Sequence, residues 1–333
     1  DLNLDLYPQK KTFTANGNMR VRNTSKDAMV EIRLTTGFDE VTTISPAESY
    51  NVHVVDADFK MVRLQLHQPL LPGDSLSIAF TIQSLTNTWL IRNTNVLNNG
   101  TILKNDIMPV LGFPLYRLRK NDNSGINRDF HYQARHAHKI YYTFTIGTSQ
   151  DQQAIAPGML QRRWLAGDRV YFQYRTLRPI KPVFALLSGD YVIATKEHNN
   201  KLVQIYHHPD HHFNNASIFA AVEASLALNN EFFGPFAYDT IKIVEFPRTE
   251  GSYATLMGNI IPLSEQRFVA DSRKTEAGYH DLAFYAVAHE LTHYWWGQQL
   301  LPANGPGAHF LTESITEYLT AMIYRDYFGD DLA

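Results

Sequence analysis

Residues 289–293 read His-Glu-Leu-Thr-His, and residues 294–297 continue the stretch as Tyr-Trp-Trp-Gly. The flanking side chains are apolar on nearly every side, which predicts a buried helix within His280–Leu300. His289 and His293 are four residues apart, so both imidazoles share one helical face, with Cβ atoms about 5–6 Å apart. A buried helix that carries two imidazoles and a carboxylate is costly unless an ion or hydrogen bonds satisfy them. The pattern therefore favours a metal site over a pair of hydrogen-bonded core histidines.

The same five residues indicate a zinc ion and a hydrolytic chemistry. Neutral imidazole nitrogens suit zinc at about 2.0–2.1 Å, and a catalytic zinc needs a third protein ligand and an open position for water. Glu290 points to the neighbouring side of the helix, where its carboxylate can take a proton from that water instead of binding the metal.

A second helical stretch, Phe310–Phe328, supplies candidates for the third ligand. Glu313 and Glu317 are four residues apart and share a face. We expect Glu313 to bind the metal and Glu317 to hydrogen-bond a ligating imidazole and fix its tautomer. The alternative for such a pair is a solvated helix face.

Toward the N-terminus, the dominant hydrophobic period from residue 1 to about residue 195 is two, which predicts strands in an antiparallel β-sandwich. Residues 62–67 and 75–82 alternate in this way around Pro72-Gly73-Asp74, so we expect a hairpin there. The polar stretch Asn93–Arg135 reads as a long irregular excursion.

After residue 196 the pattern changes to α+β. Leu202–Tyr206 and Ile241–Phe246 read as short strands, and Asn215–Phe233 reads as a helix that Gly234-Pro235 ends. We therefore expect two domains, an all-β domain over residues 1–196 and a second domain over residues 197–333.

Composition narrows the class of partner and of site. The 333 residues carry 30 Lys and Arg against 33 Asp and Glu, a formal charge of −3, so nothing favours nucleic acid as the main partner. Cysteine is absent, which excludes disulfides, thiolate metal sites and a cysteine nucleophile. No window approaches the roughly 18 consecutive apolar residues of a membrane span.

The run from His289 to Gly297, followed by Leu311-Thr312-Glu313-Ser314, resembles the gluzincin peptidases, and within them the aminopeptidase N family. The resemblance implies a β-sandwich or saddle domain followed by a thermolysin-like catalytic domain, here truncated at its C-terminal end. It implies one zinc ion held by His289, His293 and Glu313, with Glu290 as general base and a peptide as substrate. The family's transition-state tyrosine would lie beyond Ala333.

Two positions depart from the family's pattern. Nineteen residues separate His293 from Glu313, where the family has 18. The family's strand with a glutamate that binds the substrate's α-amine corresponds to Tyr253–Asn259, with Leu256 at the place of that glutamate. Glu265 is a candidate substitute for substrate binding, and strict aminopeptidase specificity does not follow.

Other stretches are similar to peptidase-like domains fused to bacterial ABC transporter permeases, namely residues 105–112, 154–158, 244–248 and 303–308. That resemblance implies a domain outside the cytoplasm, on the periplasmic face of a bacterial membrane protein, with membrane-spanning segments elsewhere in the full-length protein. It also leaves open a second function, a catalytically weak domain that binds peptides or regulates the transporter.

Two further groups of histidines stand apart from the motif. His207, His208, His211 and His212 bracket Pro209-Asp210 before the helix at Asn215. A second metal site is one interpretation, but a solvated helix entry capped by Asp or Asn is favoured. His131, His136 and His138 read as part of a surface strand.

Overall fold

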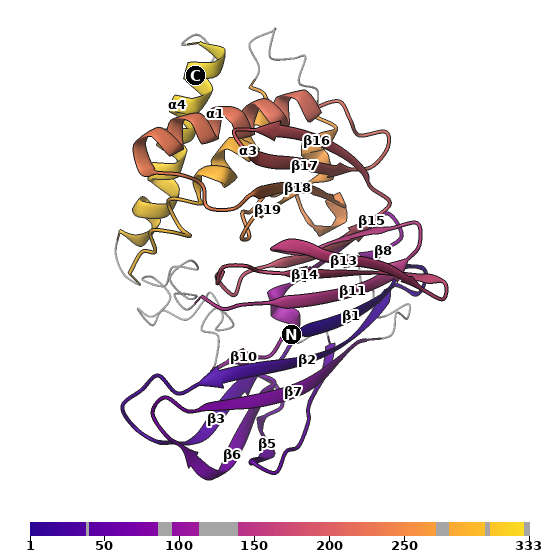
Figure 1. Ribbon diagram of the computed structural model, residues 1–333, viewed down its shortest axis with the longest axis vertical. Coiled ribbons are helices and arrows are strands. Elements are labelled where there is room, and N and C mark those ends of the chain that lie inside the picture. Colours follow the sequence, from indigo (N-terminus) through magenta and orange to yellow (C-terminus); the bar gives the residue numbers. More distant parts are fainter. Residues whose placement is uncertain (38–39, 86–94, 113–138, 271–279, 304–306, 330–333) are drawn as a thin grey trace.

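The computed structural model describes residues 1–37, 40–85, 95–112, 139–270, 280–303 and 307–329. Strands dominate, and they form one seven-stranded and three four-stranded sheets within these ranges. Figure 1 shows the β-rich part at one end of an elongated molecule and the helices gathered at the other end. The expected histidines 131, 136 and 138, and much of the expected excursion Asn93–Arg135, lie outside the described residues.

The seven-stranded sheet has the order β13-β14-β11-β1-β2-β7-β4. Its strands are β1 (Leu2–Tyr7), β2 (Thr12–Arg22), β4 (Glu40–Ile44), β7 (Ser75–Ser84), β11 (Thr143–Ser149), β13 (Met159–Ala166) and β14 (Arg169–Arg175). Neighbours pair antiparallel except β1 and β11, which are parallel. The alternating apolar residues of these strands, except those of the exposed β13, point into one core, as the period of two predicts.

A four-stranded sheet contributes to the same core. Its order is β10-β3-β6-β5, with β3 (Met29–Thr35), β5 (Tyr50–Asp56), β6 (Met61–Leu70) and β10 (Val110–Leu111). The expected hairpin at Pro72-Gly73-Asp74 is wrong, because β6 pairs with β3 and β5 while β7 pairs with β2 and β4. The turn instead joins two sheets, whose apolar side chains Leu64 and Phe80 belong to one buried cluster.

The third sheet corrects the expected irregular excursion. Its order is β12-β15-β9-β8, with β8 (Val96–Leu97), β9 (Gly100–Lys104), β12 (Gln153–Ile155) and β15 (Ala185–Gly189). Most of β9 is buried, and a short 3₁₀ turn, Asn105–Ile107, follows it. The hydrophobic pattern did not predict β8 and β9, because each has only two or three apolar residues and the flanking residues are polar.

The fourth sheet carries the second half of the chain. Its order is β16-β17-β18-β19, with β16 (Val192–His198), β17 (Lys201–His207), β18 (Thr240–Phe246) and β19 (Ile260–Ser264). β17, β18 and β19 are mutually parallel, and β16 is antiparallel to β17. The expected domain boundary at residue 196 therefore falls inside β16, which is a strand of this sheet.

Helices cover one face of the fourth sheet. They are α1 (Asn215–Phe233), with the bounds that the sequence predicts, α2 (Glu265–Phe268) and α3 (Leu282–Thr292), and α4 (Ile315–Phe328) packs on α1 and α3. A π-helical turn, Phe310–Ser314, precedes α4, and two further 3₁₀ turns cover Pro8–Lys10 and Arg248–Glu250. The expected helix His280–Leu300 is shorter in the structure, because the chain leaves the helix after Thr292 and continues in turns. These turns place Trp295 in the core, and Gly297 adopts a positive φ of 137° that favours glycine.

The opposite face of the fourth sheet packs on the β-rich half. Val244 and Phe246 from β18 share a buried cluster with Ile102 and Ile155 from the third sheet. Lys242 is buried in this junction, where its ammonium donates to the carbonyl oxygens of Ala156 (3.0 Å) and Gly158 (2.8 Å). Burial lowers the pKa of Lys242 to about 7.

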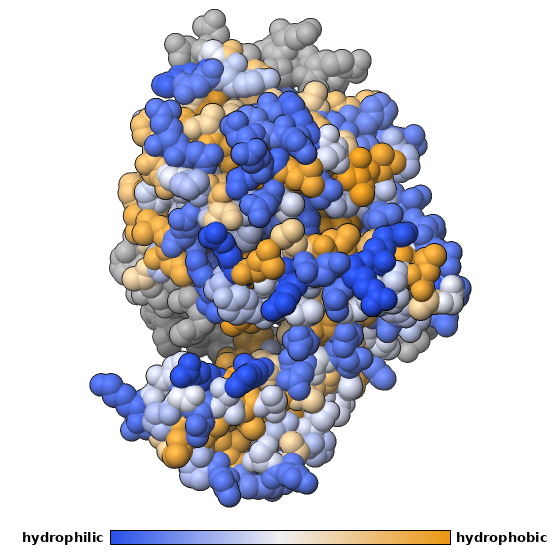
Figure 2. Space-filling model, in the orientation of Figure 1, coloured by the Kyte–Doolittle hydropathy of each residue, from blue (hydrophilic) through white to orange (hydrophobic). Residues whose placement is uncertain are grey.

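Among the described residues, no helix has both the length and the apolar character that a bilayer crossing requires. On the face drawn in Figure 2, apolar side chains are scattered among hydrophilic ones, and hydrophilic residues gather over α1 and β16.

Candidate metal centre

The N-terminus of α3 is fixed by Asp281, and this sets the register of the histidines. The Asp281 carboxylate accepts the backbone N–H groups of Ala283 (3.1 Å) and Phe284 (2.9 Å), which are otherwise unsatisfied at a helix start. It also accepts the hydroxyl of Ser217 in α1 at 2.6 Å. Phe284 and Leu291 are fully buried, so the helix cannot rotate without exposing them.

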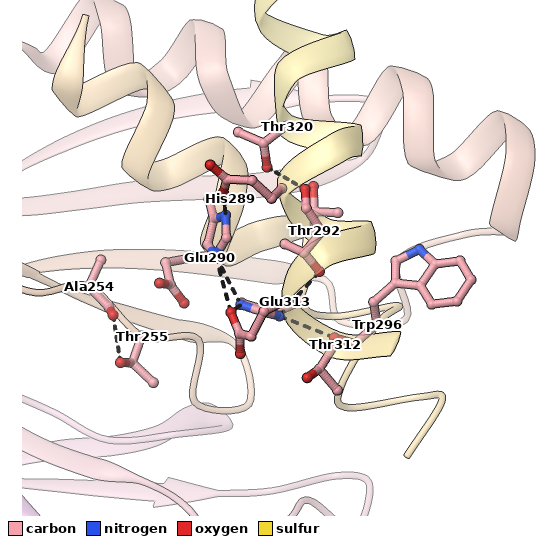
Figure 3. Close-up of polar contacts among 12 residues, drawn as sticks. Ala254, Thr255, His289, Glu290, Thr292, Trp296, Thr312, Glu313 and Thr320 are labelled. Carbon is pink, nitrogen blue, oxygen red and sulfur yellow. Dashed lines mark hydrogen bonds and ion pairs between the residues drawn. The ribbon is translucent and has the colours of Figure 1, made fainter. Parts of the chain in front are cut away.

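Three ligand atoms converge next to α3. Nε2 of His293 lies 3.1 Å from Nε2 of His289 and 3.3 Å from Oε2 of Glu313, and Nε2 of His289 lies 3.7 Å from the same oxygen. Two ligands of a tetrahedral zinc ion at 2.0–2.1 Å are separated by about 3.3 Å. The three separations bracket that value, so these residues fit a zinc ion. Figure 3 shows His289 on α3 and Glu313 on the following helical segment turned toward one another.

The protonation of His293 fits the same conclusion. Nδ1 of His293 lies 3.1 Å from the carbonyl oxygen of Trp296, which can only accept, so this nitrogen carries the proton and Nε2 offers its lone pair. Burial works against charging His293, but the carboxylates of Glu313 and Glu290 outweigh it and raise the pKa of the imidazole. The site therefore favours a positive charge between these groups, which a divalent cation supplies.

The position of Glu313 depends on the π-helical turn Phe310–Ser314. A π turn holds one residue more than an α turn. Glu313 lies in this turn, and its Oε2 is within 3.7 Å of Nε2 of both histidines.

Glu317 lies on the outer side of the site. Its Oε2 is 3.0 Å from Nδ1 of His289, but this nitrogen makes no aligned hydrogen bond, so the contact is electrostatic. The other oxygen accepts the hydroxyl of Tyr285. Burial and this hydrogen bond raise the pKa of Tyr285, which keeps the phenol as a donor.

Glu290 is held by the segment that faces α3. Its Oε2 accepts the backbone N–H of Leu256 at 2.8 Å, and the carbonyl of Leu256 accepts Nε2 of Gln298 at 3.0 Å. Burial raises the pKa of Glu290 above its usual range. The carboxylate is thus desolvated and fixed beside the metal ligands, and Oε1 has no hydrogen-bond partner among the described residues.

A pocket of about 130 Å³ lies over these groups. Its lining includes His289, Glu290, His293 and Glu313, and from the β-rich half it includes Lys181. The ammonium of Lys181 donates to the carbonyl oxygen of Gly297 at 2.9 Å, and burial lowers the pKa of this lysine to about 8.

The structure does not bring Glu265 to this pocket. Glu265 begins α2, where its Oε2 accepts the backbone N–H of Arg248 at 3.1 Å, and it groups with His211 and Glu245. The proposed role of Glu265 in holding the substrate's amine therefore has no support from its position. Leu256, where the resemblance would place the amine-binding glutamate, is buried.

Sequence reasoning missed Tyr285, Gln298, Thr316 and Lys181. The hydroxyl of Thr316 lies 3.3 Å from Nδ1 of His293, and its position three residues after Glu313 on the same helix was a usable signal. Tyr285 likewise precedes His289 by four residues. No local pattern marks Lys181, since it reaches the pocket from another part of the fold.

Comparison with protein-family models and with curated proteins found no match for this chain. Its function is therefore inferred from the geometry of the metal centre.

Proposed function

We propose that this protein is a zinc-dependent hydrolase of peptide bonds. The observation that carries the proposal is the convergence of the ligand atoms of His289, His293 and Glu313 beside the carboxylate of Glu290, which lines the same pocket. A zinc ion held by these ligands supplies Lewis-acid polarisation of a carbonyl and acidification of a water molecule.

Glu290 acts as the general base. Leu256 donates to one carboxylate oxygen, which orients the group and leaves Oε1 to take a proton from the attacking water. A raised pKa makes the carboxylate a stronger base and its acid form a better donor, so the same group can pass the proton to the leaving amine.

The pocket supports cleavage of peptides without a requirement for a free N-terminus. Its described lining contains no carboxylate besides Glu290 and Glu313, which serve the metal centre, and it contains the cation Lys181. A substrate ammonium therefore finds no further carboxylate among the described lining residues, which is the partner that a charge-assisted hydrogen bond to a free N-terminus requires. The aminopeptidase type of specificity is therefore not part of this proposal.

The location expected from the resemblance belongs to the same proposal. Outside the cytoplasm, on a bacterial membrane protein, peptides would be the substrates within reach. Detection of the protein in the periplasmic or cytoplasmic fraction of its cells tests this part separately.

The test compares the wild-type chain with Glu290→Gln, which keeps the side-chain shape and the acceptor for Leu256. We expect the variant to retain its metal by elemental analysis and to cleave a peptide library about 10²–10⁴-fold more slowly. Glu231→Gln, an exposed position on α1, is the control and should cleave at the wild-type rate. Equal cleavage by wild type and Glu290→Gln would refute the mechanism. Peptide binding without cleavage by the metal-loaded wild type would favour the binding or regulatory alternative.

A further inference from the structure

A second cluster of potential ligands lies where three parallel strands end. β17, β18 and β19 are neighbours with the same direction, so their carboxyl ends lie at one edge of the sheet. His211 follows β17 by four residues, Glu245 is the penultimate residue of β18, and Glu265 comes directly after β19. This edge is where open sheets with parallel strands most often bind ligands.

The ligand atoms of the three residues are already close. One atom from each of His211, Glu245 and Glu265 lies within 4.8 Å of the other two, and Nδ1 of His211 is 2.5 Å from Oε1 of Glu245. Ligands of one zinc ion are separated by about 3.3 Å in a tetrahedral site and by about 4.2 Å when opposite. Side-chain movements of under about 1 Å therefore suffice to place all three on one ion.

The charge at this edge is incompletely balanced by the protein. Glu245 has no exposed surface, and Glu265 lies beside it. Each carboxylate accepts one backbone N–H, from His208 at 2.8 Å and from Arg248 at 3.1 Å respectively. Among the described residues, neither forms an ion pair with a Lys or Arg side chain. Two neighbouring carboxylates, one of them fully buried, are costly beside a single imidazole, and a divalent cation neutralises them.

The surroundings also correct the favoured interpretation of the histidine-rich stretch before α1. His207 is buried rather than solvated, and the side chain of Asn214 does not cap α1 but donates to backbone carbonyls of residues 267, 268 and 270. His211 remains partly exposed, which leaves an entry path for an ion.

We infer that His211, Glu245 and Glu265 form a second divalent-metal site, separate from the one on α3. One nitrogen and two carboxylate oxygens suit Zn²⁺ or Mn²⁺. The ion ties the loop before α1 and the start of α2 to the sheet, and no residue of the α3 pocket belongs to this site.

The experiment counts metal ions bound to the whole chain. The protein is dialysed against Zn²⁺ alone, and elemental analysis gives the equivalents that remain bound. We expect His211→Gln and Glu265→Gln each to hold about one equivalent less than wild type. His212→Gln, an exposed neighbour in the same loop, is the matched control and should hold as much as wild type. Glu265→Gln keeps an acceptor for Arg248, so its fold is the less disturbed of the two.

The two sites are distinguished by variants on α3. His293→Gln removes the equivalent that belongs to the proposed zinc centre and leaves the equivalent that depends on His211. In this variant Zn²⁺ should still shift the urea midpoint upward, and the shift should vanish when His211→Gln is added. If neither His211→Gln nor Glu265→Gln lowers the metal content, the second site is refuted whatever happens at α3. If only one of these two variants binds less metal than wild type, the assignment of three ligands is refuted.

Discussion

Replacement of Glu317 by glutamine tests whether the outer carboxylate strengthens the metal centre. Oε2 of Glu317 lies 3.0 Å from Nδ1 of His289, and the Glu317 side chain is 57% exposed. An imidazole that binds zinc is neutral, so this carboxylate acts on the charge of the bound ion, and its exposure to water keeps that attraction to about 1 kcal/mol. We therefore expect Glu317→Gln to weaken zinc binding about fivefold, just under the range for groups that support metal ligands.

The assay is competition with a zinc chelator of known affinity, which measures binding without any activity. Asp326→Asn is the matched control, because Asp326 is an exposed acid on the same helix that pairs with Arg325 instead. The effect should shrink as salt is raised, since screening acts on exposed charges. An unchanged dissociation constant for zinc in Glu317→Gln, or an equal loss in Asp326→Asn, would refute the reasoning.

Two further predictions concern stability. Burial lowers the pKa of Lys242 from 10.5 to about 7. Between these two values the unfolded chain holds the proton and the folded chain does not, so the unfolding free energy rises with pH there and does not change below about pH 7. In urea unfolding, the difference in unfolding free energy between wild type and Lys242→Met should therefore shift in favour of wild type by at most about 1.4 kcal/mol per pH unit between about pH 7 and 10. A difference that does not change with pH would mean that the buried lysine stays charged. Asp281→Ala removes the cap of α3 and the acceptor for Ser217, so we expect a loss of about 2 kcal/mol in unfolding free energy; a loss below about 0.5 kcal/mol would contradict the capping role.

The local patterns of the chain predicted the parts of the site that depend on helical spacing. His289 and His293 share a face because they are four residues apart, and the same holds for Glu313 and Glu317. The bounds of α1 followed from its apolar run and from Gly234-Pro235. The roles of these residues as ligands, base and support remain predictions until metal and activity are measured.

Patterns of the same kind failed where the outcome depended on distant partners. The alternation in β6 and β7 indicated strands, but an alternating strand fits any sheet that faces the core, so it could not show that the two belong to different sheets. Glu265 was assigned by its distance along the chain from Leu256, while α2 carries it to the edge beside Glu245.

What the sequence by itself determined is the chemistry available on one helix, because residues a few positions apart have fixed neighbours in an α-helix. Only the tertiary structure decided which groups from elsewhere join them. Lys181 enters the pocket from the β-rich half, Leu256 holds Glu290 through its backbone, and His211 meets Glu245 and Glu265 at the ends of three strands. Such long-range contacts arise from the order of the strands in the sheets and from the packing of buried faces. The free energy of that packing is spread over many residues, which no short stretch of sequence contains.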